Sequence, residues 1–149
     1  MLSWRLGGVG EREAGSLPVG LVAPLAYSVA MDIAVRPATV ADARQLAELR
    51  LEWSRLAQQP SRRDVDAYTS HLADWMTGLG DRLIVRVADA DGSLVGMAWM
   101  VVVERVPNFD NRRRLDGDLQ SVYVTAAYRK RGVGRSLIQS MCDYADEIG

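Results

Sequence analysis

The sequence predicts one mixed α/β (α+β) domain whose elements follow the order β-α-α-β-β-β-α. Several short runs alternate apolar and polar residues, which is typical of half-buried strands. Longer stretches carry apolar residues at spacings of three and four, which is typical of amphipathic helices. The chain has 149 residues, 48% hydrophobic and 25% charged. These values fit a single domain of ordinary globular composition.

The composition excludes several classes of function. The 18 Lys and Arg residues nearly balance 19 Asp and Glu residues, whereas proteins that bind nucleic acid non-specifically carry a basic excess. One Cys and one His argue against a disulfide framework and against a zinc site. No uncharged apolar run reaches the length of a membrane span. We therefore expect a soluble cytoplasmic protein without metal, nucleic-acid or membrane partners.

The first 31 residues differ from the rest of the chain. Residues 1–30 contain many glycines and two prolines, and they show no helical or strand period. A secretory signal is an alternative interpretation, but acidic residues flank the apolar stretch and Pro24 interrupts it. We predict a disordered extension or a mis-assigned start over residues 1–31, and a single domain over residues 32–149.

The first strand and the first helix follow directly. Ile33 and Val35 alternate with polar neighbours, and Pro37 ends the predicted strand. The segment Thr39-Val40-Ala41-Asp42 resembles a capping box, with Asp in place of the usual Glu or Gln. The helix is expected to continue toward Pro60. Its apolar stripe consists of Ala43, Leu46, Leu49, Trp53 and Leu56.

A second helix begins after Ser61, which is a predicted N-cap with Asp64 three residues further on. Gly78 and Gly80 are expected to end this helix. Its apolar stripe consists of Val65, Tyr68, Leu72, Trp75, Met76 and Leu79. The default interpretation of the aromatic residues on the two stripes, Trp53, Tyr68 and Trp75, is core packing.

The second half of the domain is predicted to be strand-rich. Asp91-Gly92 is a strong signal for a two-residue hairpin turn. We predict strands at residues 83–88, 94–103 and 119–124, a polar loop at 108–116 containing Arg112, Arg113 and Arg114, and a helix at 132–148.

The segment from Leu119 to Arg135 carries the clearest chemical signal. A strand runs into a basic, glycine-containing loop and then into a helix, and the free N–H groups at a helix start bind anions. Gly132 and Gly134 lack a Cβ atom, so a phosphate can approach the backbone closely. Positive charge is added by Arg129, Lys130, Arg131 and Arg135. The alternative is that the glycines form a turn and the arginines coat a solvated surface.

Two common phosphate-binding motifs do not fit this segment. A P-loop requires Lys and then Ser or Thr after its second glycine, which Gly134-Arg135 does not provide. A dinucleotide-binding fingerprint requires a third glycine, which is absent here.

The segment Arg129-Lys130-Arg131-Gly132-Val133-Gly134 resembles the Arg/Gln-x-x-Gly-x-Gly/Ala signature of the GNAT acyltransferase superfamily. The preceding Val122-Tyr123-Val124 and Tyr128, and the start from Ile33 to Asp42, are also similar to this family. The resemblance implies a GNAT-like mixed sheet and acetyl-CoA as co-substrate. It further implies acetyl transfer to a primary amine of a small molecule or a peptide.

The resemblance assigns roles to named residues. The backbone amides of Lys130, Arg131, Gly132, Val133, Gly134 and Arg135 would hold the pyrophosphate of acetyl-CoA, together with the side chain of Arg129. Val122, Tyr123 and Val124 form the strand along which the pantetheine arm would lie, paired with the main chain of the two valines. The Val122 amide would stabilise the oxyanion.

Several family members use a glutamate on the same strand to deprotonate the amine. Asp118 lies at the corresponding spacing, and the shorter aspartate would act through a bridging water. Alternatively Asp118 only opens the strand, and Glu104 is a rival base.

The remaining polar residues have structural interpretations. His71, the single imidazole, falls in a region that lines the acceptor pocket in the family, but a surface position is the simpler reading. Arg112 to Arg114 are interpreted as a solvated loop or as an attraction for an acidic acceptor. Cys142 is predicted to lie in the core on the buried face of the last helix.

The chain departs from the family pattern at Gly149, where the last predicted helix ends. The usual C-terminal β-α-β-β part is lacking, and no tyrosine matches the family's general acid. Residues 119–124 are then expected to form a bare strand edge, prone to pairing in a homodimer. An alternative function is therefore a non-catalytic acyl-CoA-binding or interaction module.

Overall fold

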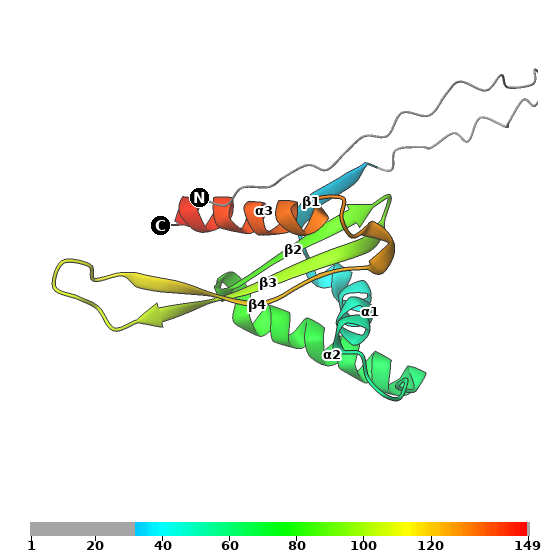
Figure 1. Ribbon diagram of the computed structural model, residues 1–149. Coiled ribbons are helices and arrows are strands. Elements are labelled where there is room, and N and C mark those ends of the chain that lie inside the picture. Colours follow the sequence, from blue (N-terminus) through cyan, green and yellow to red (C-terminus); the bar gives the residue numbers. More distant parts are fainter. Residues whose placement is uncertain (1–31, 149) are drawn as a thin grey trace, which may run out of the picture.

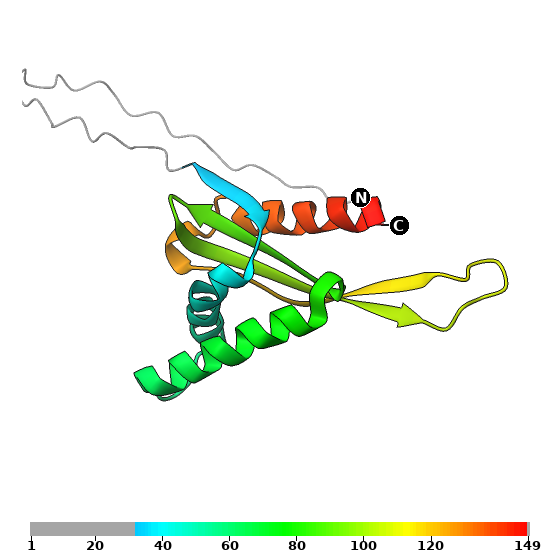
Figure 2. The same cartoon turned by 180° about the vertical axis from the view of Figure 1, so that it is seen from behind.

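The computed structural model describes residues 32–148, so the expectation for residues 1–31 lies outside the described part. These residues form a four-stranded sheet in the order β1-β2-β3-β4, with every neighbouring pair antiparallel. One helix covers one face of the sheet and two helices cover the other (Figures 1 and 2). The predicted class and element order are confirmed. No parallel pair, which a mixed sheet requires, occurs among the described strands.

The bounds of the elements agree with most of the predicted ranges. The order is β1 (Ile33–Pro37), α1 (Ala43–Ser54), α2 (Arg62–Leu79), β2 (Leu83–Ala90), β3 (Ser93–Arg105), β4 (Arg114–Val124) and α3 (Val133–Ile148), with single 3₁₀ turns at residues 40–42, 80–82 and 126–128. None of the described helices is both long enough and apolar enough to cross a bilayer.

Two apolar cores lie on opposite faces of the sheet. On one face α1 and α2 pack against β2 and β3 around Leu46, Leu72, Val87 and Trp99. On the other face α3 packs through Val133, Leu137 and Met141. We call these the α1/α2 face and the α3 face. Because side chains alternate along a strand, each residue of the sheet is assigned to one of them.

The predicted helix starts are confirmed by their capping hydrogen bonds. The Thr39 N–H donates to the Asp42 carboxylate at 2.8 Å, which stabilises the 3₁₀ turn that leads into α1. At the start of α2, the Asp64 N–H donates to the Ser61 hydroxyl at 3.2 Å and the Ser61 N–H donates back to the Asp64 carboxylate. Gly80 ends α2, as expected.

The end of α1 was predicted incorrectly. Arg55 adopts a left-handed conformation with φ of 49°, which ends the helix at Ser54 and not near Pro60. Leu56 therefore lies outside the helix and is 49% exposed. Trp53, in the last turn, is 43% exposed and packs against the Arg50 guanidinium instead of the core.

The hairpin formed by β3 and β4 is longer than predicted, and it projects from the body of the domain (Figure 1). Its ladder continues to the pair Arg105 and Arg114, so Arg114 belongs to a strand and not to a loop. An ion pair between Arg105 and Asp116, at 2.7 Å, accompanies this extension. Arg112 and Arg113 remain in the exposed connection.

Cys142 was also predicted incorrectly, because it is exposed. Leu137 and Met141, four residues apart, define the buried stripe of α3. Cys142 follows Met141 by one residue, which turns its side chain roughly 100° around the helix axis and away from the sheet.

Candidate active site

The outer edge of β4 is open, since no strand between residues 32 and 148 pairs with it. The Thr125 N–H donates to the Val95 carbonyl at 2.9 Å, so these opposite residues form a hydrogen-bonded pair. Antiparallel ladders alternate such pairs with pairs that do not exchange hydrogen bonds. Tyr123 therefore directs its main chain toward β3, whereas Val122 and Val124 direct theirs to the open edge.

A β-bulge interrupts the pairing of β4 at Gln120. Ser121 lies opposite Trp99 and Leu119 lies opposite Met100, which leaves Gln120 as the extra residue. The bulge shifts the alternation by one position, so that Gln120 and Ser121 both face α1 and α2. This bulge was not predicted from the sequence.

The loop before α3 leaves its backbone accessible. Lys130 and Gly132 have positive φ values of 60° and 83°. The Ser136 N–H makes the first helical hydrogen bond, to the Gly132 carbonyl at 3.0 Å. The N–H groups of residues 133–135 precede it and have no partner within the helix. A Cβ placed on Gly132 would meet no atom within 4 Å, so the space beside this backbone is open.

The four cations predicted at this loop lie around it, and all four are exposed. The Arg129 guanidinium donates to the Val124 carbonyl at 2.9 Å and stacks over the Tyr123 ring at 5.5 Å. Arg131 lies over the Tyr128 ring at 5.6 Å. Arg129 thus brings positive charge directly to the open edge of β4. We call this group of cations and free amides the anion-binding corner, after the ligand that the sequence predicts for it.

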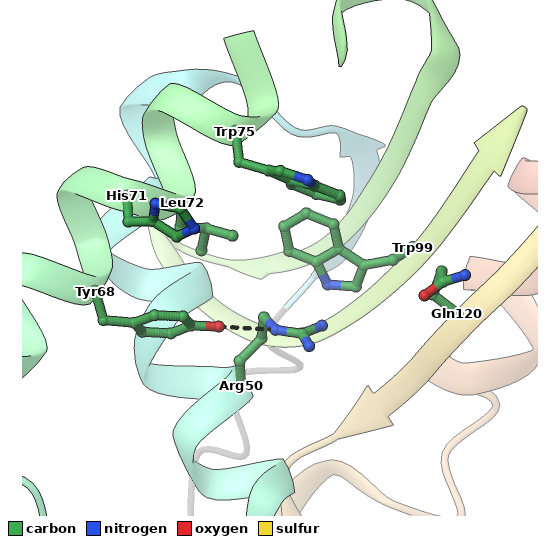
Figure 3. A pocket seen from close by; sticks show the side chains of 7 residues that line it. All are labelled: Arg50, Tyr68, His71, Leu72, Trp75, Trp99 and Gln120. Atoms are coloured by element: carbon green, nitrogen blue, oxygen red, sulfur yellow. Dashed lines mark hydrogen bonds between the residues drawn. The ribbon is translucent and has the colours of Figure 1, made fainter. Parts of the chain in front are cut away.

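A cavity of about 230 Å³ lies on the α1/α2 face, next to the bulge. It is bounded by α1, α2, β3 and β4, as Figure 3 shows. Trp75 and Trp99 form one wall, with ring centroids 6.2 Å apart. The lining residues are Arg50, Tyr68, His71, Leu72, Trp75, Trp99 and Gln120.

Sequence reasoning identified part of this cavity. His71 is exposed, as the simpler interpretation predicted, and it lines the cavity; its place in an acceptor pocket stays a prediction. Trp75 is 40% exposed toward the cavity and is not a core residue. Arg50 and Gln120 were missed, because a lone Arg on a helix and a lone Gln in a strand belong to no motif.

Arg50 is held at the centre of the cavity wall. Its Nε donates to the Tyr68 hydroxyl at 2.9 Å and its Nη1 donates to the Ser121 hydroxyl at 3.3 Å. Its guanidinium carbon lies 5.5 Å from the centroids of both the Trp53 and the Trp99 rings. One side chain therefore connects α1, α2 and β4, and Figure 3 shows its hydrogen bond to Tyr68.

The two predicted bases lie on different faces of the sheet. Asp118 pairs with Val101, which is two residues from Trp99 and therefore on the α1/α2 face. Asp118 is exposed and accepts a hydrogen bond from the Gln120 amide, which lines the cavity. Glu104 follows Met100 by four residues and lies on the α3 face. The cavity is thus accessible to Asp118 and not to Glu104.

The side chain of Tyr123 lies on the α1/α2 face of the sheet and packs against its core. Its hydroxyl donates to the Glu52 carboxylate at 2.7 Å. Burial raises the pKa of the Tyr123 hydroxyl, and the hydrogen bond to Glu52 adds to this effect. The part of Tyr123 in cofactor binding stays a prediction.

Comparison with known proteins gives a consistent result. Residues 44–149 match the Acetyltransferase (GNAT) family. A ribosomal-protein-alanine N-acetyltransferase from Brucella melitensis biovar Abortus 2308 superimposes with a TM-score of 0.60 at 24% identity, over 78% of this chain and 74% of that one. No curated protein sequence matches the chain.

Two further solved structures give similar TM-scores at lower sequence identity. A predicted acetyltransferase from Clostridium acetobutylicum with acetyl-CoA gives a TM-score of 0.60 at 14% identity, over 78% of this chain and 75% of that one. An aminoglycoside acetyltransferase from an uncultured soil metagenomic sample gives a TM-score of 0.61 at 17% identity, over 78% of this chain and 72% of that one.

The structure thus combines an open strand edge, a basic helix start and an aromatic cavity beside the same strand, in an α/β domain. The matched residues cover more than half of the chain, and the chain belongs to the GNAT acetyltransferase family. It is therefore an acyltransferase by family.

Proposed function

We propose that this protein transfers an acetyl group from acetyl-CoA to a primary amine by direct attack, without a covalent enzyme intermediate. The observation that carries the proposal is the anion-binding corner, where free amides and exposed cations adjoin the open edge of β4. The site fits acetyl-CoA, because the space beside Gly132 is open where a phosphate would approach.

Acetyl-CoA supplies an activated thioester when it is bound. The amides of Lys130 through Arg135 and the nearby guanidinium groups would hold its pyrophosphate. The Val122 and Val124 main chains would pair with the pantetheine arm as an added strand does. The Val124 carbonyl already accepts from Arg129, so Arg129 would move aside or share that acceptor.

Two groups of this chain would act on the reacting atoms. The Val122 amide would donate to the thioester carbonyl oxygen and stabilise the charge that develops there. Asp118 would take the proton of the attacking ammonium through a water molecule. The C–N bond would then form and the C–S bond would break, and the second proton lost by the amine nitrogen would pass to the departing thiolate. We assign that second proton transfer to no residue.

The test is a comparison of two glycine variants that share the same backbone strain. Gly132→Glu places a negative side chain in the open space beside the loop. Gly92→Glu is the matched control, because Gly92 has φ of 86° and also open space around its Cβ, but lies in the turn between β2 and β3.

We expect acetyl-CoA at 100 times its dissociation constant to stabilise the wild type and Gly92→Glu by about 2.7 kcal/mol. Gly132→Glu should lose this stabilisation, because its carboxylate repels the pyrophosphate. The measurement is the shift of the unfolding temperature. Equal shifts in both variants would show that the loop is not the binding site.

Thiol release with a panel of amines then separates turnover from binding. Release that depends on both acetyl-CoA and an amine supports the transferase. Stabilisation by acetyl-CoA without thiol release would favour the alternative function, a non-catalytic acyl-CoA-binding module.

A further inference from the structure

We infer that the amine acceptor is a small amino acid-like molecule, with a carboxylate that Arg50 binds and a large apolar or aromatic side chain that packs against Trp75. This inference rests on the proposed function, and it concerns the cavity beside β4 on the α1/α2 face. It is carried by the charge, the lining and the size of that cavity.

The charge of the cavity favours an anionic partner. Arg50 is half-buried and its two hydrogen bonds go to neutral hydroxyl groups. No carboxylate within the described residues forms an ion pair with it. A guanidinium group has five N–H donors in a fork that matches a carboxylate. A cation held in partly desolvated surroundings gains most from an anion that enters with the ligand.

The positions of the acidic residues complete the argument. Within residues 32–148, no acidic side chain lines the cavity. Asp118 on β4 is hydrogen-bonded to the lining residue Gln120. A zwitterionic acceptor matches this arrangement, with its carboxylate at Arg50 and its ammonium group directed to Asp118.

The size and the lining of the cavity narrow the class of acceptor further. A volume of about 230 Å³ lies below the roughly 300 to 1,000 Å³ typical of drug-sized ligand pockets. A ligand larger than this volume would extend beyond the cavity walls. The walls are mainly apolar, with the tilted Trp75 and Trp99 rings and Leu72. A single aromatic or branched aliphatic side chain fits such a surface.

The contrasting explanation is that Arg50 only connects α1, α2 and β4. The test therefore uses a binding readout that a purely structural residue would not affect. The probes are N-acetylphenylalanine and N-acetylphenylalaninamide, which differ only in the charge of one group. Binding to the full chain is measured by calorimetry, without acetyl-CoA.

We expect the wild type to bind the carboxylate probe at least tenfold more tightly than the amide probe. Arg50→Gln should reduce this ratio to about one, and Arg50→Lys should give an intermediate value. Arg44→Gln is the control on the same helix, because Arg44 is exposed and pairs with Glu48 and Asp66 outside the cavity. It should retain the wild-type ratio.

If a variant fails to fold, the ratio of the two probe affinities measured for the wild type still decides the inference. Equal binding of the two probes to the wild type would overturn it. Thiol release with simple amines, combined with equal probe binding, would overturn the acceptor class and leave the transferase proposal standing. Carboxylate-selective binding without thiol release for any amino acid would support the cavity assignment and contradict the transferase.

Discussion

Asp118 is the residue whose function can be tested most directly. Its carboxylate lies on the cavity face and contacts Gln120 at the bulge. We expect Asp118→Asn to lower kcat by about 10² to 10⁴, the usual contribution of a general base. The affinity for acetyl-CoA should not change, because the anion-binding corner is untouched. Steady-state kinetics and a thermal shift with acetyl-CoA measure the two quantities separately.

Glu104→Gln is the control for this experiment. Glu104 was a rival base in the sequence, but it lies on the α3 face of the sheet. Its substitution should change neither kcat nor affinity. If Glu104→Gln lowered kcat while Asp118→Asn did not, the face assigned to the acceptor would be wrong.

At the residue scale, the sequence predicted main-chain features better than side-chain partners. The glycine loop was identified because glycines and charges lie next to one another in the chain. Arg50 was not, since its partners Tyr68 and Ser121 are distant in sequence. The bulge did leave a signal, because the apolar alternation of Val124 and Val122 is displaced by one position at Leu119.

At the scale of elements, one partly buried charge cluster fixes β1 to the start of α1. Arg36 on β1 donates to the Asp42 carboxylate at 2.9 Å and to Asp89 at 2.9 Å. The hydrogen bond from Arg36 lowers the pKa of Asp42 to about 2, with a further contribution from the Thr39 N–H and against the opposing effect of burial. Asp42 itself is 8% exposed.

The lowered pKa makes a prediction about acid stability. A carboxylate with a depressed pKa in the folded state stabilises the protein above its unfolded pKa. This stabilisation, about 2 kcal/mol for such a shift, should therefore be lost as the pH falls from about 4 to about 2. Asp42→Asn should lose it at pH 7 and should flatten the acid limb of the stability curve. Urea unfolding at several pH values measures both effects.

Asp66→Asn is the matched control for Asp42→Asn. Asp66 forms an ion pair with Arg44 in which both side chains are about half exposed. Surface pairs of this kind contribute about 0 to 1 kcal/mol. An equal loss of stability in the two variants would contradict the special role of the Arg36 cluster.

Local signals determined how well each element could be predicted. Asp91 and Gly92 have positive φ values of 52° and 86°, which the two-residue hairpin turn requires. The two capping boxes could also be predicted from the sequence, because each lies within four consecutive residues. The end of α1 depends on the left-handed conformation of Arg55, which no local residue type indicates. The extension of the β3–β4 hairpin depends on cross-strand pairing and was likewise not visible in the sequence.

At the scale of the whole molecule, the order of elements was enough to predict the layers. Two helices between β1 and β2 cover one face and the last helix covers the other. The cavity was not predicted as a whole, since it joins four elements that meet only after folding. The sequence indicated an acceptor region near His71, but not its charge or its size.

The open edge of β4 leads to a last prediction, which joins the proposed ligand and the expected homodimer. Both would use the outward main-chain groups of Val122 and Val124, and one N–H cannot donate to both at once. Acetyl-CoA should therefore shift a dimer toward monomer, measured by sedimentation equilibrium with and without acetyl-CoA. Gly132→Glu leaves the edge of β4 intact but disrupts the anion-binding corner. This variant should dimerise as the wild type does, and acetyl-CoA should not dissociate its dimer. A wild-type dimer that acetyl-CoA leaves unchanged would mean that association uses another surface, and a chain that stays monomeric throughout would contradict pairing along this edge.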